Sequence, residues 1–506
     1  SSPGIKFLGW FFLENMKIYD KLYSYFSFKK SMNNIKKTKI VATIGPVTSS
    51  EEMLSKLLQE GLNVVRINFS HGDFAEHQIK INNGRAASKK TGIPVAFLQD
   101  LGGPKIRIGE FSKESINLKE GEMFTLTTEK IIGDEKRVYV NYPLLPKEVK
   151  VGGTILLHDG KKELEIVDIK GDEVKCKIIV GGDIKGRRGV NLPGAHLSIS
   201  SITEKDRKDL AFGIKNKVDF VALSFVRKPD DIIELRKILD KAKLPAGIIA
   251  KIETPEAVEN IDKIIELSDG IMVARGDLAI EVPAEDVPLI QKMIIEKCNK
   301  AGKPVITATQ MLESMIKSPV PTRAEVSDIA NAILDGTDAI MLSEETTLGE
   351  YPIEAVKVMA KVAMRVEGDY IHRKINGERK RRSENSDDVA DVITSEAADI
   401  AHGINASFIV VLTQSGFSAR MISRHKVSQD IVAMTPDKNT FAKLILSYGI
   451  TPVFIRNFKT LNEAMVIVRN HFLTSKLAKK GDKVVVVAGM PFGKKGATNM
   501  ILVEKI

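Results

Sequence analysis

Eight short runs of β-branched and other apolar residues recur along the chain, and stretches of helical length separate most of them. The runs are Lys39–Ile44, Asn63–Asn68, Val95–Gln99, Asp219–Ser224, Gly247–Ile252, Gly270–Ala274, Val305–Ala308 and Asp338–Leu342. The stretches between them include Glu51–Glu60, Pro229–Leu239, Pro255–Leu267 and Glu285–Lys300. Strands that alternate with helices predict βαβ units and a parallel sheet, and eight such strands can close a (β/α)8 barrel. We therefore expect an α/β fold of this type.

Two other patterns interrupt and follow the predicted barrel. Between residues 105 and 190, short strands alternate with glycine turns, which predicts an inserted small β-barrel domain. A second α/β pattern begins after Ser386, with strand-like runs at Ser407–Leu412, Ile431–Met434, Pro452–Ile455 and Lys483–Ala488. The expected division is an N-terminal extension (1–35), barrel segments (36–104 and 191–375), the insertion (105–190), a linker (376–386) and a C-terminal α/β domain (387–506).

Composition narrows the class of protein. The only two cysteines, Cys176 and Cys298, lie far apart, which argues against a disulfide framework or a zinc site and favours a reducing compartment such as the cytoplasm. The net charge is +10, but basic and acidic residues are interleaved, so we expect no nucleic-acid partner. The apolar run 7–13 is too short to span a membrane. The aromatic N-terminus remains open to three interpretations: a transit peptide, a surface-lying amphipathic segment or an extension upstream of a start at Met32.

Polar or charged residues follow the carboxyl end of every predicted barrel strand from the second to the eighth. In chain order they are Arg66, Asn68, Ser70, His71, Asp100, Lys105, Arg107, Ser224, Arg227, Lys251, Glu253, Arg275, Gly276, Asp277, Thr309, Gln310, Ser343, Glu344 and Glu345. Active sites of β/α barrels form at this end from several strands at once. The sequence therefore predicts an active site there.

The types of these residues indicate phosphoryl transfer. Glu253 and Asp277 end adjacent strands, so the two carboxylates can share a magnesium ion. Lys251 is two residues before Glu253 and shares its face of the strand, where an ammonium would oppose a metal-held phosphate. A purely structural Lys–Glu ion pair is the alternative. Arg66 is suited to phosphate, and Gly276 allows a ligand close to the backbone. A metal, an anion clamp and a central lysine together suit phosphoryl transfer.

Several segments, in this order, resemble the pyruvate kinase family, and the resemblance extends from Lys36 to nearly the C-terminus. The segments are Thr38–Pro46, Arg66–Gly72, Gly189–Gly194, Lys251–Glu253, Ile271–Leu278, Ala308–Met315 and Pro321–Glu325. The resemblance implies transfer of a phosphoryl group from phosphoenolpyruvate to ADP, which gives pyruvate and ATP in glycolysis. It also implies a homotetramer.

The resemblance assigns roles to individual residues. Glu253 and Asp277 would bind Mg²⁺, with Mn²⁺ as an alternative, and Lys251 would stabilise the transferring group. Arg66 would hold phosphate, and the backbone of Arg275, Gly276 and Asp277 together with Thr309 would hold the substrate carboxylate. The enolate would be protonated through water near Thr309 and Ser343. The nucleotide phosphates would be bound by Asn68, His71, Arg107 and Arg188. Asp159 lies in the insertion, which resembles the lid of the family.

Three departures from the family pattern have consequences. The family's monovalent-cation position corresponds to Asn68, Ser70, Asp100 and Leu101, and Lys105 stands where potassium-dependent members carry glutamate. Leu101 offers no side-chain oxygen, so we expect that K⁺ is not required. Glu344 replaces a glycine near the mouth of the barrel, and its effect stays open.

The third departure concerns regulation. A phosphate-binding pattern occurs in the C-terminal domain at Thr413, Gln414, Ser415, Gly416, Phe417 and Ser418. The late loop 491–496 lacks the tryptophan and arginine of members activated by fructose bisphosphate. We expect a sugar monophosphate or nucleoside monophosphate as effector, with Lys494 and Lys495 assisting. The alternatives to an active kinase are an aldolase-type lyase and a catalytically silent effector-binding member.

Overall fold

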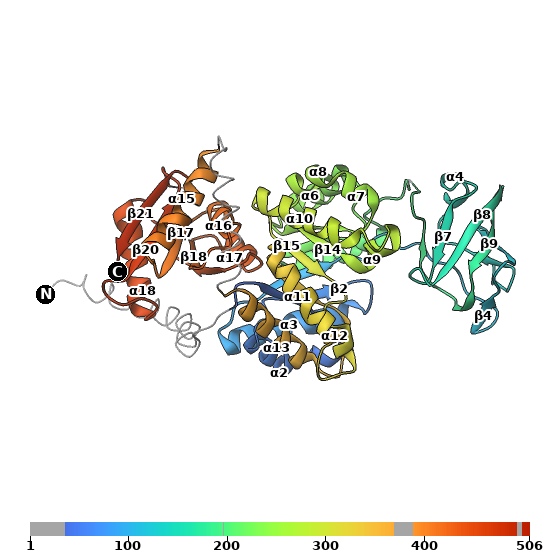
Figure 1. Ribbon diagram of the computed structural model, residues 1–506, viewed down its shortest axis with the longest axis horizontal. Helices are drawn as coiled ribbons and strands as arrows, with labels where there is room; N and C mark the ends of the chain where they lie inside the picture. Colours follow the sequence, from blue (N-terminus) through green and yellow to red (C-terminus); the bar gives the residue numbers. More distant parts are fainter. Residues whose placement is uncertain (1–35, 196, 369–387, 493–497) are drawn as a thin grey trace.

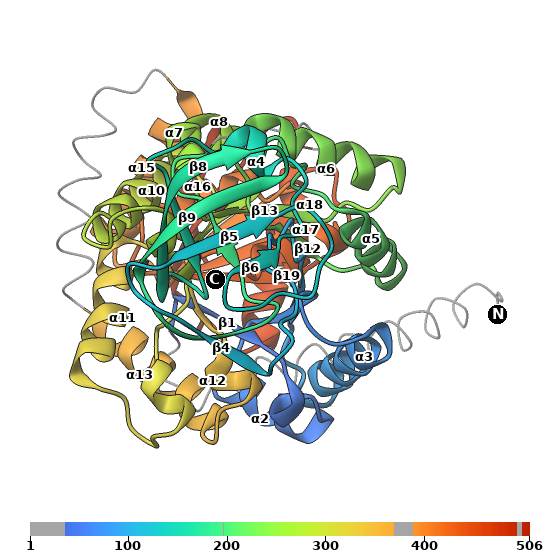
Figure 2. The same cartoon turned by 90° about the vertical axis from the view of Figure 1, so that its right-hand side faces the viewer.

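The computed structural model describes residues 36–195, 197–368, 388–492 and 498–506. The expected N-terminal extension, the linker 376–386 and Lys494 and Lys495 lie outside the described residues. The described chain forms three regions in a row (Figure 1): the C-terminal α/β region, a central barrel and an all-β insertion at the far end. In Figure 2 the insertion faces the viewer, and its strands lie in front of the barrel. We call the insertion the lid.

The central region is a closed barrel of parallel strands in the order β1-β16-β15-β14-β13-β12-β3-β2. The strands are β1 (Lys39–Thr43), β2 (Val64–Asn68), β3 (Ala96–Asp100), β12 (Phe220–Leu223), β13 (Gly247–Ile252), β14 (Gly270–Ala274), β15 (Val305–Ala308) and β16 (Ala339–Leu342). Each coincides with one of the eight predicted runs to within one residue at either end. The barrel is therefore confirmed, and all of its strands run toward the same rim.

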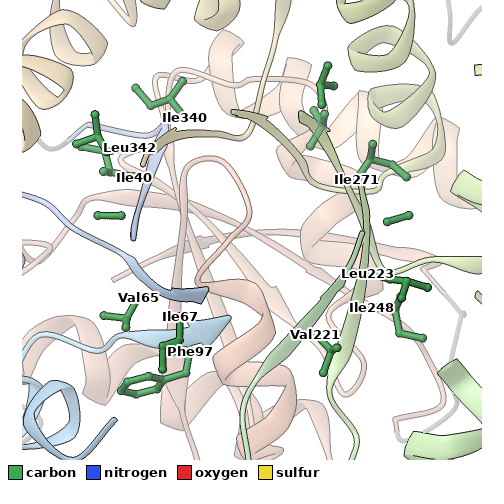
Figure 3. Packing of buried hydrophobic residues seen from close by; sticks show 14 of the residues in the cluster. Ile40, Val65, Ile67, Phe97, Val221, Leu223, Ile248, Ile271, Ile340 and Leu342 are labelled. Carbon is green, nitrogen blue, oxygen red and sulfur yellow. The ribbon is translucent and has the colours of Figure 1, made fainter. Parts of the chain in front are cut away.

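Helices surround the barrel, and most pack on its outer face. They are α2 (Glu51–Gln59), α3 (Phe74–Thr91), α5 (Glu204–Asn216), α6 (Pro229–Lys241), α7 (Pro255–Glu259), α8 (Ile261–Leu267), α9 (Arg275–Glu281), α10 (Val287–Ala301), α11 (Arg323–Asp335), α12 (Glu344–Thr347) and α13 (Pro352–Val366). Of these, the short α7, α9 and α12 follow the carboxyl ends of strands near the rim. Figure 3 shows outward side chains of the strands, such as Val65, Ile67 and Ile248, in the apolar layer under the outer helices. Burial of this layer is the main force that holds the helices on the barrel.

One predicted helix is wrong. The segment Pro255–Leu267 is not continuous but forms α7 and α8, which meet at Asn260. The Asn260 side-chain amide donates 3.0 Å hydrogen bonds to the carbonyls of Glu256 and Arg227. The Asn260 N–H also donates to the Glu256 carbonyl, and the two helices are separated because Asn260 departs from helical geometry, with φ −91° and ψ 10°.

The lid has its own apolar core and consists of two sheets. The six-stranded sheet contains β11 (Val190–Asn191), β7 (Thr154–Leu157), β8 (Lys162–Lys170), β9 (Glu173–Val180), β5 (Met123–Thr127) and β6 (Arg137–Tyr139) in that order. The other pairs β4 (Ser115–Leu118) with β10 (Gly182–Lys185). The expected β insertion is therefore present after the carboxyl end of β3, where its described strands form two sheets and not one closed barrel, together with the short helix α4 (Leu145–Glu148).

The C-terminal region is a five-stranded sheet with helices on both faces. Its strands are β19 (Ile450–Phe454), β18 (Asp430–Thr435), β17 (Phe408–Leu412), β20 (Lys483–Ala488) and β21 (Met500–Lys505). The helices α15 (Val389–Gly403), α16 (Phe417–Ser423) and α17 (Lys438–Leu444) contribute to the core on one face, and α18 (Leu461–Thr474) to the core on the other. The antiparallel strand β21 was not predicted, because its partly exposed residues lack a clear burial pattern.

Buried charges join this region to the base of the barrel. Lys426 Nζ lies 3.0 Å from Asp338 Oδ1, just before β16, and 4.5 Å from the centre of the Tyr448 ring. Lys39 Nζ on β1 donates a 2.7 Å hydrogen bond to the Ile450 carbonyl. The amino ends of the strands are thus covered by the C-terminal region, and the carboxyl ends face the lid. The described part of the chain contains no helix with the length and apolarity that a membrane crossing requires.

Candidate active site

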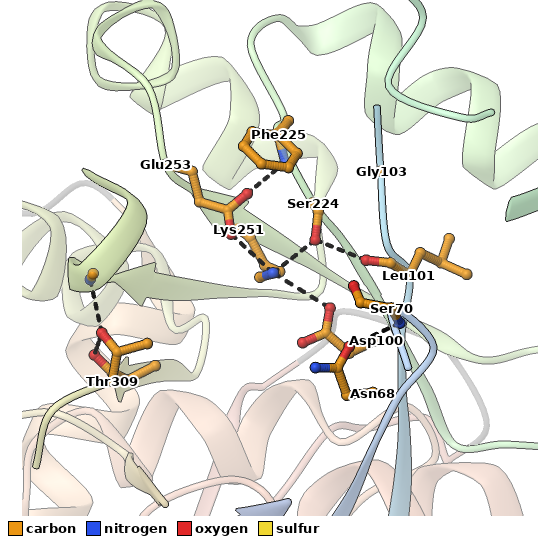
Figure 4. Close-up of polar contacts among 12 residues, drawn as sticks. Asn68, Ser70, Asp100, Leu101, Gly103, Ser224, Phe225, Lys251, Glu253 and Thr309 are labelled. Atoms are coloured by element: carbon orange, nitrogen blue, oxygen red, sulfur yellow. Dashed lines mark hydrogen bonds and ion pairs between the residues drawn. The ribbon is translucent and has the colours of Figure 1, made fainter. Parts of the chain in front are cut away.

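The ammonium of Lys251 is the centre of a buried polar cluster inside the rim of the barrel (Figure 4). Its Nζ donates a 2.6 Å hydrogen bond to Ser224 Oγ and lies 2.8 Å from Glu253 Oε1 and 3.4 Å from Asp100 Oδ1. Burial disfavours the ammonium, but the carboxylates of Asp100, Glu253 and Asp277 outweigh it and raise the pKa of Lys251 above its ordinary value. The side chain is therefore a fixed positive charge.

Asp100 at the end of β3 connects this ammonium to Arg66 on β2. Arg66 Nε lies 2.6 Å from Asp100 Oδ2, and Arg66 Nη1 donates a 2.6 Å hydrogen bond to Thr43 Oγ1. Burial works against a charged Asp100, but Lys251 and Arg66 outweigh it and hold the pKa of Asp100 below its usual range. Two cations thus share the Asp100 carboxylate, which fixes both of them at the rim of the barrel.

Glu253 and Asp277 are the two carboxylates that could hold a metal. Glu253 Oε2 accepts a 2.6 Å hydrogen bond from the Phe225 N–H, whereas Oε1 accepts no well-aligned hydrogen bond from any described residue and meets only the Lys251 ammonium. Burial raises the pKa of Glu253, and the nearby Asp277 carboxylate acts in the same direction. Two carboxylates that repel each other and an oxygen without a hydrogen bond fit a small divalent cation.

The number of carboxylates also limits the kind of metal site. Within the described residues, no group of three or more His, Cys, Asp or Glu side chains is close enough to enclose a metal ion. Mg²⁺ is usually bound by one or two carboxylates, with the other positions left to water and substrate oxygens. The donor set therefore fits Mg²⁺ or Mn²⁺ better than a structural metal.

Thr309 and Gly276 lie side by side on neighbouring strand ends. Thr309 Oγ1 accepts a 2.8 Å hydrogen bond from the Gly276 N–H and donates a 2.6 Å hydrogen bond to the Ala308 carbonyl. The φ of Thr309 is 67°, an unusual value for a β-branched residue, and strain of this kind clusters at functional sites. The arrangement presents a hydroxyl and a backbone N–H at the rim of the barrel.

Arg275 and Ser343 make ion-pair and hydrogen-bond contacts with other residues of the protein. The Arg275 guanidinium lies 2.8 Å from Asp328 and donates hydrogen bonds to the carbonyls of Ala308 and Thr309. The Ser343 N–H donates to Glu345 Oε2 at 2.7 Å, and Glu345 is buried. The Arg275 side chain therefore positions the Thr309 turn.

Most residues of the expected monovalent-cation position lie close together. Asn68 Oδ1 accepts a 3.0 Å hydrogen bond from the Ser70 N–H, and Asn68 pairs in register with Asp100. The Leu101 side chain is buried in the apolar core, and its carbonyl accepts a 2.8 Å hydrogen bond from Ser224 Oγ. The Lys105 side chain is exposed. Burial lowers the pKa of His71, and the nearby positive charge of Lys105 lowers that pKa further. Lys105 is therefore at the rim, near His71.

A cavity of about 270 Å³ separates the lid from the barrel rim. Lys105, Asp159, Asn191 and Asp277 contribute to its lining, and Asn191 Nδ2 donates a 2.8 Å hydrogen bond to Glu281 Oε1 on the barrel side. Arg107 Nη1 donates to the Arg187 carbonyl at 3.1 Å, and Arg188 Nε is buried without a hydrogen bond to any described residue. The predicted lid residue Asp159 and the candidate metal ligand Asp277 thus line one cavity, whereas the predicted nucleotide residues Asn68, His71, Arg107 and Arg188 are not part of its lining.

The expected effector loop lies in the C-terminal region, beyond the base of the barrel. Thr413 Oγ1 accepts a 3.0 Å hydrogen bond from the Gly416 N–H, and Gly416 has a φ of 77°. Ser418 Oγ lies 2.6 Å from Thr498 Oγ1, and Gln414 accepts a hydrogen bond from Thr440 of α17. The loop therefore follows the end of β17 and lies apart from the barrel rim.

Sequence reasoning gave Ser224 no role of its own. Ser224 accepts from Lys251 and donates to Leu101, so it fixes the ammonium relative to the end of β3. Its place directly after β12, among the polar residues that end the strands, was the available signal.

Comparison with known proteins identifies the family. The sequence model described as the barrel domain of pyruvate kinase matches residues 35–356, and the model described as the alpha/beta domain matches residues 391–504. The chain belongs to the pyruvate kinase family. It is therefore a phosphotransferase with the pyruvate kinase activity of glycolysis.

Curated relatives and a solved structure agree with this assignment. The chain is 46% identical over 472 residues to a pyruvate kinase from Thermotoga maritima, covering 93% of this chain and 100% of that one. It is 45% identical over 474 residues to a pyruvate kinase from Geobacillus stearothermophilus, covering 93% and 80%. A crystal structure of a pyruvate kinase from Cryptosporidium parvum is similar, with a TM-score of 0.87, 36% identity and coverage of 93% and 96%.

Proposed function

We propose that the cluster around Lys251 is the centre at which the phosphoryl group passes from phosphoenolpyruvate to ADP. The single observation that carries this proposal is a buried ammonium held by Ser224, Glu253 and Asp100 beside a candidate metal site. Charge develops on the phosphoryl oxygens during transfer, and a fixed cation in a buried site stabilises that charge without reorganisation. Arg66, which shares Asp100 with Lys251, is the second cation for the phosphate.

Glu253 and Asp277 are the residues that would hold Mg²⁺, with Mn²⁺ as the alternative ion. The bound ion would polarise a phosphoryl or carboxylate oxygen as a Lewis acid. The protein contributes the two carboxylates and the Phe225 N–H that fixes Glu253 Oε2. Lys251 lies 2.8 Å from Glu253 Oε1, the oxygen that would ligate the ion, so its charge and the ion would act on the same substrate group.

We assign the carboxylate end of the substrate to the rim beside Thr309. The Arg275, Gly276 and Asp277 backbone would supply N–H groups, and Thr309 would exchange its bond from Gly276 for one to the substrate. Water near Thr309 and Ser343 would deliver the proton to the enolate. The Arg275–Asp328 ion pair holds this turn in place and supports the assignment.

The nucleotide is assigned to the opening between the lid and the barrel. Asn68, His71, Arg107 and Arg188 would contact its phosphates, and the unpaired Arg188 Nε supports this role. Asp159 and its turn line the opposite wall, where movement of the lid would exclude water during transfer.

Potassium independence is part of the proposal. The carboxylate of Asp100 is already neutralised by Arg66 and Lys251, and the Leu101 carbonyl is occupied by Ser224. The Lys105 ammonium at the rim would repel a further cation by Coulomb interaction. Positively charged side chains of the protein would therefore take the place of a bound K⁺.

Regulation and assembly complete the proposal. A phosphorylated effector, a sugar monophosphate or nucleoside monophosphate, would bind at residues 413–418, and the enzyme would be a cytoplasmic homotetramer. The proposed domains are the barrel, made of residues 36–104 and 191–375, the lid (105–190) and the C-terminal domain (387–506).

A coupled assay of pyruvate formation tests the proposed reaction. We expect pyruvate only when both phosphoenolpyruvate and ADP are present, with loss of activity in EDTA and recovery on adding Mg²⁺ or Mn²⁺. An aldolase-type lyase would release pyruvate without ADP, and a silent effector-binding protein would release none. Activity that survives EDTA would contradict the metal assignment to Glu253 and Asp277.

A further inference from the structure

A second polar hollow lies at the base of the barrel, on the side opposite the active site. Its volume is about 360 Å³, and it is lined by the connections before β12 and β13 together with one face of α17. Figure 1 shows α17 on the side of the C-terminal region that faces the barrel. The hollow is therefore formed jointly by two regions of the chain, and its volume lies in the range of small-ligand sites.

Three lysines from three different segments line this hollow. They are Lys217, Lys243 and Lys443. Among the described residues, none of the three ammoniums has a hydrogen bond or an ion pair, whereas the neighbouring Arg236 is paired with Asp269. Three unpaired cations around one hollow favour an anionic ligand.

The environment of these lysines strengthens this argument. Lys443 is half-buried, and burial lowers its pKa although the Asp269 and Asp437 carboxylates oppose this effect. Lys217 and Lys243 have φ values of 51° and 55°, at helix ends where glycine or asparagine would be less strained. Lys217 and Lys243 are exposed to solvent, so the main effect of a ligand anion would be to offset the desolvation of Lys443.

One carboxylate in the hollow narrows the chemistry of the ligand. Asp219 Oδ2 accepts a 2.7 Å hydrogen bond from the Phe97 N–H, and no described residue donates to Oδ1. A free carboxylate oxygen would repel a bare anion but accept a hydrogen bond from a hydroxyl group. Asn439, one turn before Lys443 on α17, adds a side-chain amide. The combination fits a molecule with both a phosphate and hydroxyls.

Helix α17 and the residues after it contact both the base of the barrel and the loop 413–418, so a ligand bound to α17 could affect both. Phe441, Ile445 and Leu446 pack with the apolar residues at the inner base of the barrel. Thr440 Oγ1 donates a 2.7 Å hydrogen bond to the Gln414 carbonyl in the loop 413–418. A ligand that bridges Lys443 and the two barrel connections would therefore tie α17, and with it that loop, to the barrel.

We propose that this basal hollow binds a sugar monophosphate, with the phosphate on Lys217, Lys243 and Lys443 and a hydroxyl on Asp219. The site is distinct from the proposed effector loop 413–418, none of whose residues lines the hollow. Its occupancy couples the barrel to the C-terminal region.

Protection of lysines from acetylation locates the ligand. The full-length enzyme is treated briefly with an acetylating reagent, with and without glucose 6-phosphate, and each lysine is quantified by mass spectrometry. We expect several-fold slower acetylation of Lys443, Lys217 and Lys243 and unchanged acetylation of the exposed Lys215, which lies outside the hollow. Unchanged rates at all three lysines would overturn the proposal, even if the sugar phosphate binds elsewhere.

Calorimetry supplies the second measurement. The Lys443→Gln and Lys217→Gln variants should each weaken glucose 6-phosphate binding about tenfold, and Lys215→Gln should not. Glucose without the phosphate should not bind, and inorganic phosphate should bind more weakly than the sugar phosphate because Asp219 opposes it. A Kd for the native enzyme weaker than about 1 mM, or variants that bind as well as the native enzyme, would refute the site.

Discussion

At the scale of single residues, the geometry of the cluster around Lys251 depends on which side chains contact the Asp100 carboxylate. The sequence correctly predicted that Lys251 and Glu253 share one face, because alternation along a strand is a local property. It did not predict the Arg66–Asp100 pair, since that contact depends on the register between β2 and β3. The assignment of Arg66 to phosphate stays a proposal, and the structure adds that Arg66 is held in place by two partners.

Potassium dependence is the first prediction at this scale. Turnover with Mg²⁺ in sodium-free and potassium-free buffer, with an organic cation to hold the ionic strength, should equal turnover with K⁺ within about twofold, because cations of the protein already neutralise Asp100. The Lys105→Glu variant should become activated by K⁺, though incompletely because Leu101 remains. Lys150→Glu, at an exposed position in the lid, is the matched control and should show no activation. Many-fold activation of the native enzyme by K⁺ would show that the site still needs the ion.

At the scale of elements, helix α5 approaches strand β3 very closely at one glycine. A Cβ added at Gly213 would lie 1.9 Å from Gln99 Oε1, and Gln99 is fully buried next to Asp100. Gln99 Nε2 also donates a 2.6 Å hydrogen bond to the Asp209 carbonyl of α5. The contact therefore sets the distance between a barrel helix and the strand that carries a residue of the site.

The Gly213→Ala variant should be clearly less stable. Overpacking of a buried contact costs about 1–3 kcal/mol, which we expect as a loss in the free energy of unfolding measured with urea. Gly403→Ala is the control, because nothing lies within 4 Å of a Cβ added at that exposed helical position. Its effect should remain within about 0.5 kcal/mol. Equal effects of the two variants would contradict the close approach.

The loop 413–418 is the element to test for regulation. A panel of phosphorylated metabolites, assayed at subsaturating phosphoenolpyruvate, should contain a sugar monophosphate or nucleoside monophosphate that changes the rate, and fructose bisphosphate should act more weakly. The Ser415→Glu variant, which adds a negative charge to the loop, should lose the response at unchanged basal activity. Flat activity across the panel would mean that the loop does not bind an effector.

At the scale of the whole molecule, the order of the regions was predictable and some of their contacts were not. Strand and helix periodicity predicted the barrel, the insertion and the C-terminal region because these patterns are local. Contacts such as Lys426 with Asp338 join residues far apart in the chain, so no local pattern reveals them. The edge strand β21 escaped prediction for a related reason, since its stability comes from pairing with β20.

The pH dependence of stability is a prediction for the folded chain as a whole. Burial lowers the pKa of His77 to about 4, and the His77 ring packs against Phe69 with 1% of the residue exposed. Between pH 6.5 and 4 the unfolded chain binds this proton and the folded chain does not, so stability falls as the pH falls through that window. We expect a loss of about 3 kcal/mol from this residue, measured by urea unfolding at a series of pH values.

The contribution of His77 is isolated by substitution. The His77→Leu variant should lose less stability between pH 6.5 and 4 than the native enzyme, whereas His402→Leu, at an exposed position on α15, should keep the native slope. Identical slopes for the native enzyme and His77→Leu would contradict the lowered pKa.

The central claim is that Lys251 stabilises the phosphoryl group as it transfers, and one measurement tests it most directly. The Lys251→Met variant is assayed for pyruvate formation and, in parallel, titrated with phosphoenolpyruvate in the presence of Mg²⁺. Because the ammonium acts mainly on charge that develops in the transition state, we expect kcat to fall by roughly 10²–10³-fold while the Kd for phosphoenolpyruvate changes little. Lys263→Met, an exposed control on α8, should match the native enzyme. A folded Lys251→Met variant with native turnover would contradict the account.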